Sequence, residues 1–517
     1  MRQNMVLFNI HLKLNSYSHY DCTQMKRVAS GISPVIAIDK RKRQFLYKQV
    51  YESYRQAIVE GRLAPGQRVP STRVAAMELG ISRIPVLDAY AQLLAEGYFE
   101  SRVGSGTVVS RSLPDRAIPL RAASAPSPSA SGGRRPVAKR CSALPSGGDL
   151  YRRRGRGAFA VGQVAFDHFP FQVWNRLVTR YSRRMRAGGL DYGDAMGLPD
   201  LRDAIASHLR TARGLHCQAE QILVVSGSQQ GLELACRVLL DAGDRVWMEE
   251  PGYSFARSVF TSNDCRIVPV PVDSEGLDVA SGIRQCRRAR AAVVTPSHQY
   301  PLGATMSASR RLQLLDWAAK NEAWIIEDDY DSEHRYEGLP ATSLQGMDRN
   351  SRVVYVGTLS KVLFPSLRLG YVVAPLDLVE RFRAVRLAMD ICPPTLFQNV
   401  LADFIREGHF SRHIRRMRTL YAERRSVLIE SLRRELGSVA ELSGGQAGMH
   451  LAILMNGIDD RVTADRAERV RLWLTPLSPA YHRSENARTG FILGLGSVPV
   501  QDIPDAVRKL GTILHGK

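Results

Sequence analysis

The chain has 517 residues, 44% of them hydrophobic, and a formal net charge of +21 from 71 Lys and Arg against 50 Asp and Glu. A single hydrophobic core stops growing well below this length, so we expect two or more domains. No apolar run approaches the roughly 18 residues of a membrane helix, and the N-terminus lacks the pattern of a secretory signal. We therefore expect a cytoplasmic protein with no membrane partner, and the positive charge indicates a polyanionic one.

The cysteines exclude a second class of protein. Seven of them are scattered along the chain, with no Cys-x-x-Cys pair and no histidine at zinc-finger spacing. Such cysteines are typical free thiols of a reducing compartment. We therefore expect no disulfide framework and no structural metal.

Composition divides the chain into four parts. Residues 1–38 match no pattern, Met25 is an alternative start, and we assign this extension no function. Residues 39–111 form a compact block. Residues 112–158 carry ten Lys or Arg against two Asp or Glu and are rich in Ala, Ser, Pro and Gly, which cannot bury enough apolar area to offset the entropy of ordering. We expect a flexible basic linker there and a second domain over 159–517.

Three helices are predicted in the compact block. Apolar residues recur at helical spacing over 46–60. Ser71 or Thr72 is placed to cap a short second helix, and a glycine-containing turn follows it. Ser82 is placed to cap a third helix over 83–96. Two short helices joined by such a turn predict a helix-turn-helix, whose second helix lies in the major groove of DNA.

The segment after these helices predicts a wing. Residues 98–109 have the pattern of strand, turn and strand, with Gly104 and Gly106 in the turn. Glycine permits positive φ and lets the backbone come close to a phosphate. Residues 39–111 therefore predict a winged helix-turn-helix, an α+β domain that binds double-stranded DNA.

Three strings in this block, GRLAPGQRVPSTRVAAMELGISR, AYAQLLAEGYFE and GSGTVV, resemble the DNA-binding domain of the GntR family of transcriptional regulators. The resemblance implies a cytoplasmic, nucleoid-associated protein. The DNA contacts that it implies come from Arg68, Ser71, Arg73, Ser82, Arg83, Gly104, Ser105 and Gly106. After Arg83 the chain has Ile84 and Pro85 where the family has a polar residue and Thr, which removes one or two base or phosphate contacts and leaves the operator open. A block that mediates protein contacts is the alternative.

From residue 159 onward, short β-branched runs alternate with longer amphipathic segments. Strands are predicted at 222–225, 291–295, 323–326 and 352–356, and a helix at 308–321. This alternation indicates a mainly parallel sheet covered by helices, the α/β class.

A lysine follows one of these strands. The strand at 352–356 continues into Gly-Thr-Leu-Ser-Lys, which ends at Lys361. Burial and nearby cations can lower the pKa of such a lysine and keep it nucleophilic. The hydroxyls of Thr358 and Ser360 and the guanidinium of Arg368 are placed to hold a phosphate beside it. These are two of the four parts of a site for pyridoxal 5'-phosphate (PLP), which also needs an acid at the pyridine nitrogen and a stacking ring.

The remaining parts follow other strands. The strand at 323–326 delivers Asp328 and Tyr330 to a strand end, where open α/β sheets bind ligands. We expect Asp328 to pair with the protonated pyridine nitrogen and Tyr330 to donate to the phenolic oxygen; a metal site is the weaker alternative. Ser228 and Gln229 begin a helix, whose backbone N–H groups offer an anion site. Tyr253 is the candidate stacking ring, and a packed core tyrosine is its alternative.

Four strings, EEPGYSFAR, TPSHQYPLG, IIEDDYDSEHRY and GTLSKVLFPSLRLGYVVAP, resemble the MocR/GabR-type group of GntR regulators. The resemblance implies a winged helix-turn-helix joined to a PLP-dependent transferase domain of fold type I. It implies Lys361 as the catalytic Schiff-base lysine, Asp328 as the pyridine partner, Tyr330 as the O3' donor, Tyr253 as the stacking ring, and Ser228, Gln229, Thr358, Ser360 and Arg368 around the phosphate. It also implies a homodimer, in which Tyr192 reaches the phosphate of the neighbouring subunit.

Two departures concern the substrate side of this site. Aminotransferases commonly have Asn before the Pro of the PLG turn, whereas this chain has Tyr300, so Gln299 or His298 is the candidate substitute donor to O3'. The arginine that grips a substrate carboxylate matches Arg488 only in a shifted register. Both departures weaken the step from cofactor attachment to transamination.

We therefore interpret the chain as a PLP-dependent DNA-binding transcriptional regulator whose aminotransferase-like domain senses an amine, an amino acid or PLP itself. An active aminotransferase tethered to DNA is the alternative. A third hypothesis, a large domain kept only as a structural dimeriser, is disfavoured by the intact Lys361, Asp328 and Arg368. The effector, the operator and the direction of regulation do not follow from the sequence.

Overall fold

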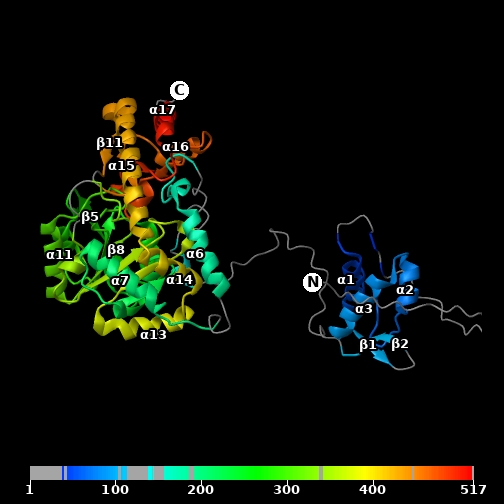
Figure 1. The fold of residues 1–517 in the computed structure, drawn as a ribbon. Helices are drawn as coiled ribbons and strands as arrows, with labels where there is room; N and C mark the ends of the chain where they lie inside the picture. The colour runs from blue at the N-terminus through cyan, green and yellow to red at the C-terminus, as the bar shows by residue number, and fades with distance from the viewer. Residues whose placement is uncertain are drawn as a thin grey trace, which may run out of the picture. The chain divides into compact units, whose positions relative to one another are not determined.

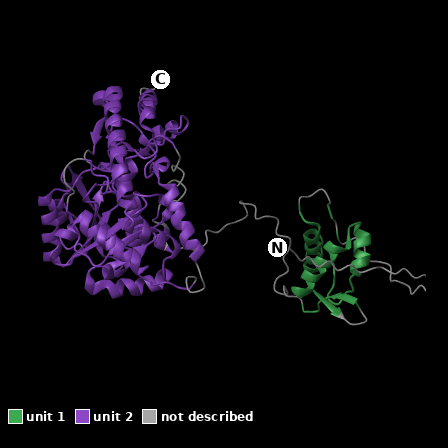
Figure 2. Ribbon diagram, in the orientation of Figure 1, with its two compact units in different colours: residues 1–135 green, residues 136–517 purple. Residues whose placement is uncertain are grey.

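The computed structural model describes residues 36, 38–39, 44–102, 106–112, 138–142, 144, 157–184, 191–336, 342–444 and 447–514. The chain divides into two compact units, residues 1–135 and 136–517 (Figure 2). Within the described ranges, no helix has both the length and the apolar character needed to cross a bilayer.

The first unit consists of three helices and a two-stranded ribbon. Its elements are α1 (Leu46–Val59), α2 (Thr72–Leu79), α3 (Arg83–Ala95), β1 (Phe99–Arg102) and β2 (Gly106–Val109) (Figure 1). The strands pair antiparallel with Phe99 opposite Val109. The rings of Tyr54, Tyr90 and Phe99 meet edge to face with centroids 5.1 to 5.5 Å apart, and this cluster is the centre of the unit's core. The predicted winged helix-turn-helix is confirmed.

The two serines that begin α2 and α3 behave differently. The hydroxyl of Ser71 accepts a hydrogen bond from the Val74 amide at 3.3 Å, so Ser71 and not Thr72 caps α2. Ser82 stands at the N-cap of α3, but its side chain makes no cap hydrogen bond. The residue three positions on is Pro85, which has no N–H to donate to a capping oxygen.

An eight-stranded sheet forms the centre of the second unit, in the order β3-β10-β9-β8-β7-β4-β5-β6. The strands are β3 (Ile222–Val225), β4 (Arg245–Glu250), β5 (Arg266–Asp273), β6 (Gly276–Leu277), β7 (Ala291–Val294), β8 (Trp324–Asp329), β9 (Val353–Thr358) and β10 (Gly370–Val373). β10 is antiparallel to β3 and β9, and β6 is antiparallel to β5, while the other pairs are parallel. The predicted mainly parallel sheet is therefore confirmed.

Helices cover this sheet. They are α6 (Phe171–Arg184), α7 (Pro199–Arg213), α8 (Ser228–Leu239), α9 (Ser254–Ser262), α10 (Val279–Cys286), α11 (Ala308–Asn321), α12 (Leu344–Met347), α13 (Val379–Asp390) and α14 (Leu396–Arg406). Their apolar faces form three buried clusters with the strands, and Trp247 of β4 stacks on Trp317 of α11 with ring centroids 3.8 Å apart. The short helix α4 (Lys139–Ser142) lies within the span predicted as a linker, and its Arg140 approaches Asp264 to 3.8 Å. Most of the remaining span lies outside the described residues.

A smaller antiparallel sheet near the C-terminus was not predicted. Its strands are β11 (Glu441–Ser443), β12 (His450–Leu454), β13 (Thr475–Pro476) and β14 (Gly490–Gly494), in the order β11-β12-β14-β13. It packs with α16 (Asp460–Glu468) and with α15 (His409–Leu436) and α17 (Ile503–Leu514), which lie side by side (Figure 1). Residues 157–161 join this sheet through the Trp473 amide, which donates to Ala158 O, and the Gly494 amide, which donates to Phe159 O.

One buried ion pair fixes the end of β8. Arg213, the last residue of α7, donates to Asp329 Oδ2 at 2.8 Å and to Ser297 Oγ at 2.9 Å. The two charged side chains are 4% and 1% exposed. Ser332 and Tyr355 also donate to Asp329 Oδ2. Helix α7, β9 and the segment after β7 are thereby tied to the strand that carries Asp328.

We expect Arg213→Met to destabilise the second unit by about 3–5 kcal/mol, because it leaves a buried carboxylate without its cation. Exposed Arg210 on the same helix donates to Cys217 O at 3.0 Å, so the control Arg210→Met should cost about 1 kcal/mol. Denaturant unfolding measures both. Equal losses in the two variants would contradict the assigned role of the ion pair.

Candidate functional site

Two neighbouring strands bring the lysine and the acid together. β8 and β9 are parallel, with Asp328 opposite Val356 and Asp329 opposite Gly357. Lys361 follows the end of β9 by three residues and is half-buried, and its charge interacts with that of Asp328. The segment before α6 completes the surroundings of the amine, since a Cβ on Gly162 would lie 2.7 Å from Lys361 Nζ. Gly162 has φ +80°, a conformation that glycine adopts readily.

The Asp328 carboxylate is suited to bind a cationic group. It is 3% exposed, and among the described residues its Oδ1 has no hydrogen-bond partner. Burial, together with the nearby charges of Asp329 and Glu249, raises the pKa of Asp328 to about 7, and the charge of Lys361 opposes part of this rise. A buried carboxylate is costly without a partner. The orphaned oxygen therefore fits a cationic N–H group such as a protonated pyridine nitrogen.

The start of α8 offers an anion cradle. Arg368 donates to Ser226 O at 2.6 Å, and its guanidinium lies close to Gly227, where a Cβ would be 3.2 Å from Nη1. Ser360 is 8% exposed and its hydroxyl has no partner among the described residues. The first backbone N–H groups of α8, those of Ser228 and Gln229, have no acceptor within the helix. A phosphate fits this set of donors.

Two further candidates contribute less than expected through their side chains. The Thr358 hydroxyl accepts from the Ser360 amide at 3.2 Å, so it shapes the turn before Lys361. The Gln229 side chain donates to Phe255 O at 2.8 Å and ties α8 to α9, which leaves only its backbone for an anion.

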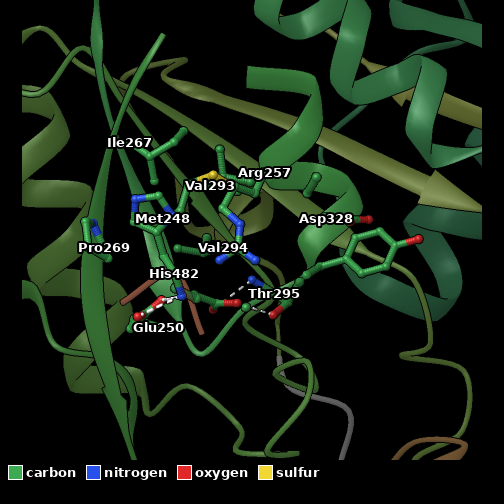
Figure 3. A pocket seen from close by; sticks show the side chains of 14 residues that line it. Met248, Glu250, Arg257, Ile267, Pro269, Val293, Val294, Thr295, Asp328 and His482 are labelled. Atoms are coloured by element: carbon green, nitrogen blue, oxygen red, sulfur yellow. Dashed lines mark hydrogen bonds between the residues drawn. The ribbon is translucent and has the colours of Figure 1, made fainter. Parts of the chain in front are cut away.

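Tyr253, the candidate stacking ring, contacts a second aromatic ring and lines a recess. It is half-buried, and its ring meets Tyr300 at 5.4 Å between centroids and 75° between planes. Tyr253 and Asp328 both line a recess whose other walls include Arg257 and His482 (Figure 3). Tyr253 therefore shares this recess with the acid.

The structure distinguishes between the two candidate substitutes for the missing Asn. Gln299 is turned into the fold, where its Nε2 donates to Pro251 O at 2.9 Å and to Glu249 at 3.2 Å. His298 Nδ1 lies 3.0 Å from the Tyr330 hydroxyl. His298, and not Gln299, therefore supports the side of the site that Tyr330 occupies.

His298 belongs to a buried cluster that the sequence did not reveal. Its Nδ1 lies 3.3 Å from Asp331 Oδ2, and one ligand-type atom from each of His298, Asp331 and His450 lies within 4.8 Å of the others. Asp331 also accepts from the Met449 amide at 2.9 Å, and His450 Nε2 lies 3.1 Å from Pro301 O. The cluster thus fastens the large sheet to the C-terminal sheet beside Tyr330.

Two candidates have exposed side chains. Tyr192 is 77% exposed. Arg488 pairs with Glu441 and its side chain is 47% exposed. The shifted-register match to a substrate-binding arginine stays a prediction.

The DNA candidates gather at the start of α2 and α3. Arg83 Nε donates to Thr72 Oγ1 at 3.2 Å and so joins the two helix starts, next to exposed Arg73. Arg68 packs on the ribbon, where a Cβ on Gly106 would lie 3.2 Å from its Nη2. Ser71 and Ser82 are exposed at the two N-caps. Gly104 and Ser105 lie outside the described residues.

Comparison with known proteins covers both units. Residues 46–109 match the family described as bacterial regulatory proteins, gntR family, and residues 158–491 match aminotransferase class I and II. The "Probable rhizopine catabolism regulatory protein MocR" of Rhizobium meliloti is 39% identical over 481 residues, 92% of this chain and 95% of the relative. The "HTH-type transcriptional regulator TauR" of Rhodobacter capsulatus is 34% identical over 475 residues, 89% of this chain and 94% of the relative. An archaeal alanine:glyoxylate aminotransferase of known structure is 26% identical with a TM-score of 0.68, over 74% of this chain and 98% of that one.

We expect Asp328→Asn to make the protein, prepared without PLP, progressively more stable relative to wild type as pH rises. An unfolded Asp titrates near 3.8 and folded Asp328 near 7. Between these values the folded state binds the extra proton, so the carboxylate lowers the stability of wild type as pH rises from about 4 to about 7. The free energy of unfolding at pH 5 and pH 8 measures this.

The control for this prediction is Asp316→Asn, which removes an exposed carboxylate that pairs with Lys320. That variant should show no increase relative to wild type between the two pH values. A constant gap between Asp328→Asn and wild type would contradict the assigned protonation of Asp328.

Proposed function

The chain belongs to the GntR family of bacterial transcriptional regulators, in the MocR/GabR-type group that joins a helix-turn-helix to an aminotransferase class I and II domain, and we propose that Lys361 anchors PLP in a ligand sensor. The first unit binds DNA and the second belongs to a PLP-dependent fold. The observation that carries the proposal is the juxtaposition of Lys361 with buried Asp328, whose Oδ1 lacks a partner among the described residues.

Each side chain then has a defined task around the cofactor. PLP, when bound, supplies a carbonyl carbon that links reversibly to amines. Lys361 presents its amine to that carbon, and Asp328 keeps the pyridine nitrogen protonated. Ser360, Arg368 and the start of α8 hold the phosphate.

In this proposal, aromatic side chains would help to position the cofactor. Tyr253 would stack on the cofactor, and Tyr330, whose hydroxyl lies 3.0 Å from His298 Nδ1, would donate to its phenolic oxygen. Tyr300 fills the place of the usual Asn and contacts Tyr253 and Tyr330. These aromatic contacts support a site that holds the cofactor firmly.

We propose an amine or an amino acid as the effector. Only an amine can take the place of Lys361 on the cofactor, and a ligand shifts DNA binding by its differential affinity for the two states of the protein. The position of Arg488, paired with Glu441 at the surface, supports sensing over efficient turnover of amino acids. The relatives named for rhizopine catabolism and for TauR are regulators as well.

The exposed Tyr192 supports a homodimer. In this proposal Tyr192 of each chain reaches the phosphate cradle of the other. Two helix-turn-helix units then face two DNA half-sites, as paired half-sites require of dimeric regulators.

We expect the full-length protein to gain a visible absorption band on addition of PLP, and Lys361→Ala to lose it, because the band requires the covalent link. The control is Lys320→Ala, which removes an exposed lysine paired with Asp316 and should keep the band. Spectrophotometric titration measures both.

Three results would contradict the proposal. A wild-type protein that stays colourless after PLP addition would contradict the cofactor role of Lys361. Sustained keto-acid production from a panel of amino acids would show that the second unit works as an aminotransferase and not as a sensor. If a panel of amines and amino acids leaves the DNA affinity unchanged in fluorescence anisotropy, the proposal that such a ligand is the effector is wrong.

A further inference from the structure

The outward face of α3 is largely apolar. Val86, Ala89, Tyr90 and Leu93 point into the core of the first unit and are 0–3% exposed. On the other side Ile84 is 68% exposed and Leu87 is 41% exposed, and Asp88 and Ala91 continue the same stripe at helical spacing. A helix that is apolar on both faces needs a partner for the outer one.

In a helix-turn-helix the second helix lies in the major groove, with its first residues against the base edges. Ile84 is the second residue of α3, and the preceding Arg83 is hydrogen-bonded to the start of α2. The exposed arginines Arg73 and Arg83 flank this point, as phosphate contacts would. Ile84 and Leu87 therefore occupy the part of the helix that faces the bases.

The major groove displays one apolar group, the C5-methyl of thymine. An aliphatic side chain cannot donate to or accept from a base edge, so methyl contact is the recognition open to it. We propose that Ile84, with Leu87 one turn further on, recognises thymine methyl groups, so that each operator half-site carries A·T pairs where the first turn of α3 lies. This specificity rests on DNA binding and is independent of the PLP sensor.

The charges around the stripe favour DNA over a protein partner. Asp88 is the acid on the exposed stripe, and a phosphate would repel it. It fits a base edge, where a carboxylate accepts from the amino group of cytosine. Arginines at the flanks and an apolar stripe with one acceptor at the centre thus match phosphates outside and bases inside.

The test uses the full-length chain and operator DNA that it selects from a random duplex library. The selected operator is then made with deoxyuridine in place of thymidine, which removes only the methyl groups. We expect wild type to lose roughly fourfold in affinity for each methyl that Ile84 or Leu87 buries. Replacing one thymidine at a time should confine this loss to one or two positions per half-site.

Ile84→Ala should bind the thymidine operator more weakly and should no longer distinguish it from the deoxyuridine operator at one of these positions. Met77→Ala is the matched control, because Met77 is 76% exposed on α2 and lies outside the recognition helix. It should keep the full thymidine preference. Both side chains are exposed, so both variants should retain the wild-type melting temperature.

Three outcomes would overturn the proposal. Wild type could bind the two operators equally, or Ile84→Ala could keep the thymidine preference at every position. The third is that Ile84→Ala leaves operator affinity unchanged and instead weakens self-association in analytical ultracentrifugation, which would assign the stripe to a second copy of the chain.

Discussion

The parallel pairing of β8 with β9 is the constraint on which the site depends. It sets Asp328 beside Val356, so that the turn after β9 returns Lys361 to the same end of the sheet. The pairing is held at that end by Asp329, whose buried carboxylate binds Arg213 and Tyr355. Asp329 Oδ2 is paired with the Arg213 guanidinium, whereas Asp328, which interacts with the charge of Lys361, keeps its Oδ1 without a hydrogen-bond partner among the described residues. The fold therefore neutralises the acid that holds the strands and leaves the adjacent one for a ligand.

This arrangement places several buried carboxyl groups at one end of the sheet. The pKa values of Glu249, Glu327 and Asp328 are all raised to about 7, and burial is the largest cause for each. Thr295 supports Glu249, and the Leu344 and Gln345 amides support Glu327, whereas Asp328 keeps an oxygen without a partner among the described residues. A cation bound at Asp328 would relieve this cost. In the proposed function, cofactor binding and stability of the second unit are thus linked, because a ligand that binds only the folded state stabilises it.

Features that depend on neighbouring residues could be predicted from the sequence, whereas contacts between distant segments could not. The bounds of α1, α2, α3 and α11 follow from apolar spacing and caps, and Lys361 and Asp328 follow from strand ends. The missed cap shows a local conflict, since Pro85 removes the amide that Ser82 would need. The cluster of His298, Asp331 and His450 joins three segments separated by up to 152 residues, and Gly162 meets Lys361 across 199, as the differences of their numbers give. No spacing rule connects such positions, because the fold alone brings them together.

Specific DNA binding requires both units in this proposal: the first contacts the bases and the second pairs two copies of the chain. A thymine methyl buried by Ile84 discriminates only roughly fourfold, while specific regulators exceed their non-specific affinity by roughly a thousandfold or more. One apolar contact in one half-site cannot supply that ratio. Two half-sites engaged together multiply their discrimination, provided that the two recognition helices are held at a spacing that matches the DNA. In the proposed dimer the second unit supplies that pairing, and this gives a ligand bound beside Lys361 a physical means to alter DNA affinity without touching α3.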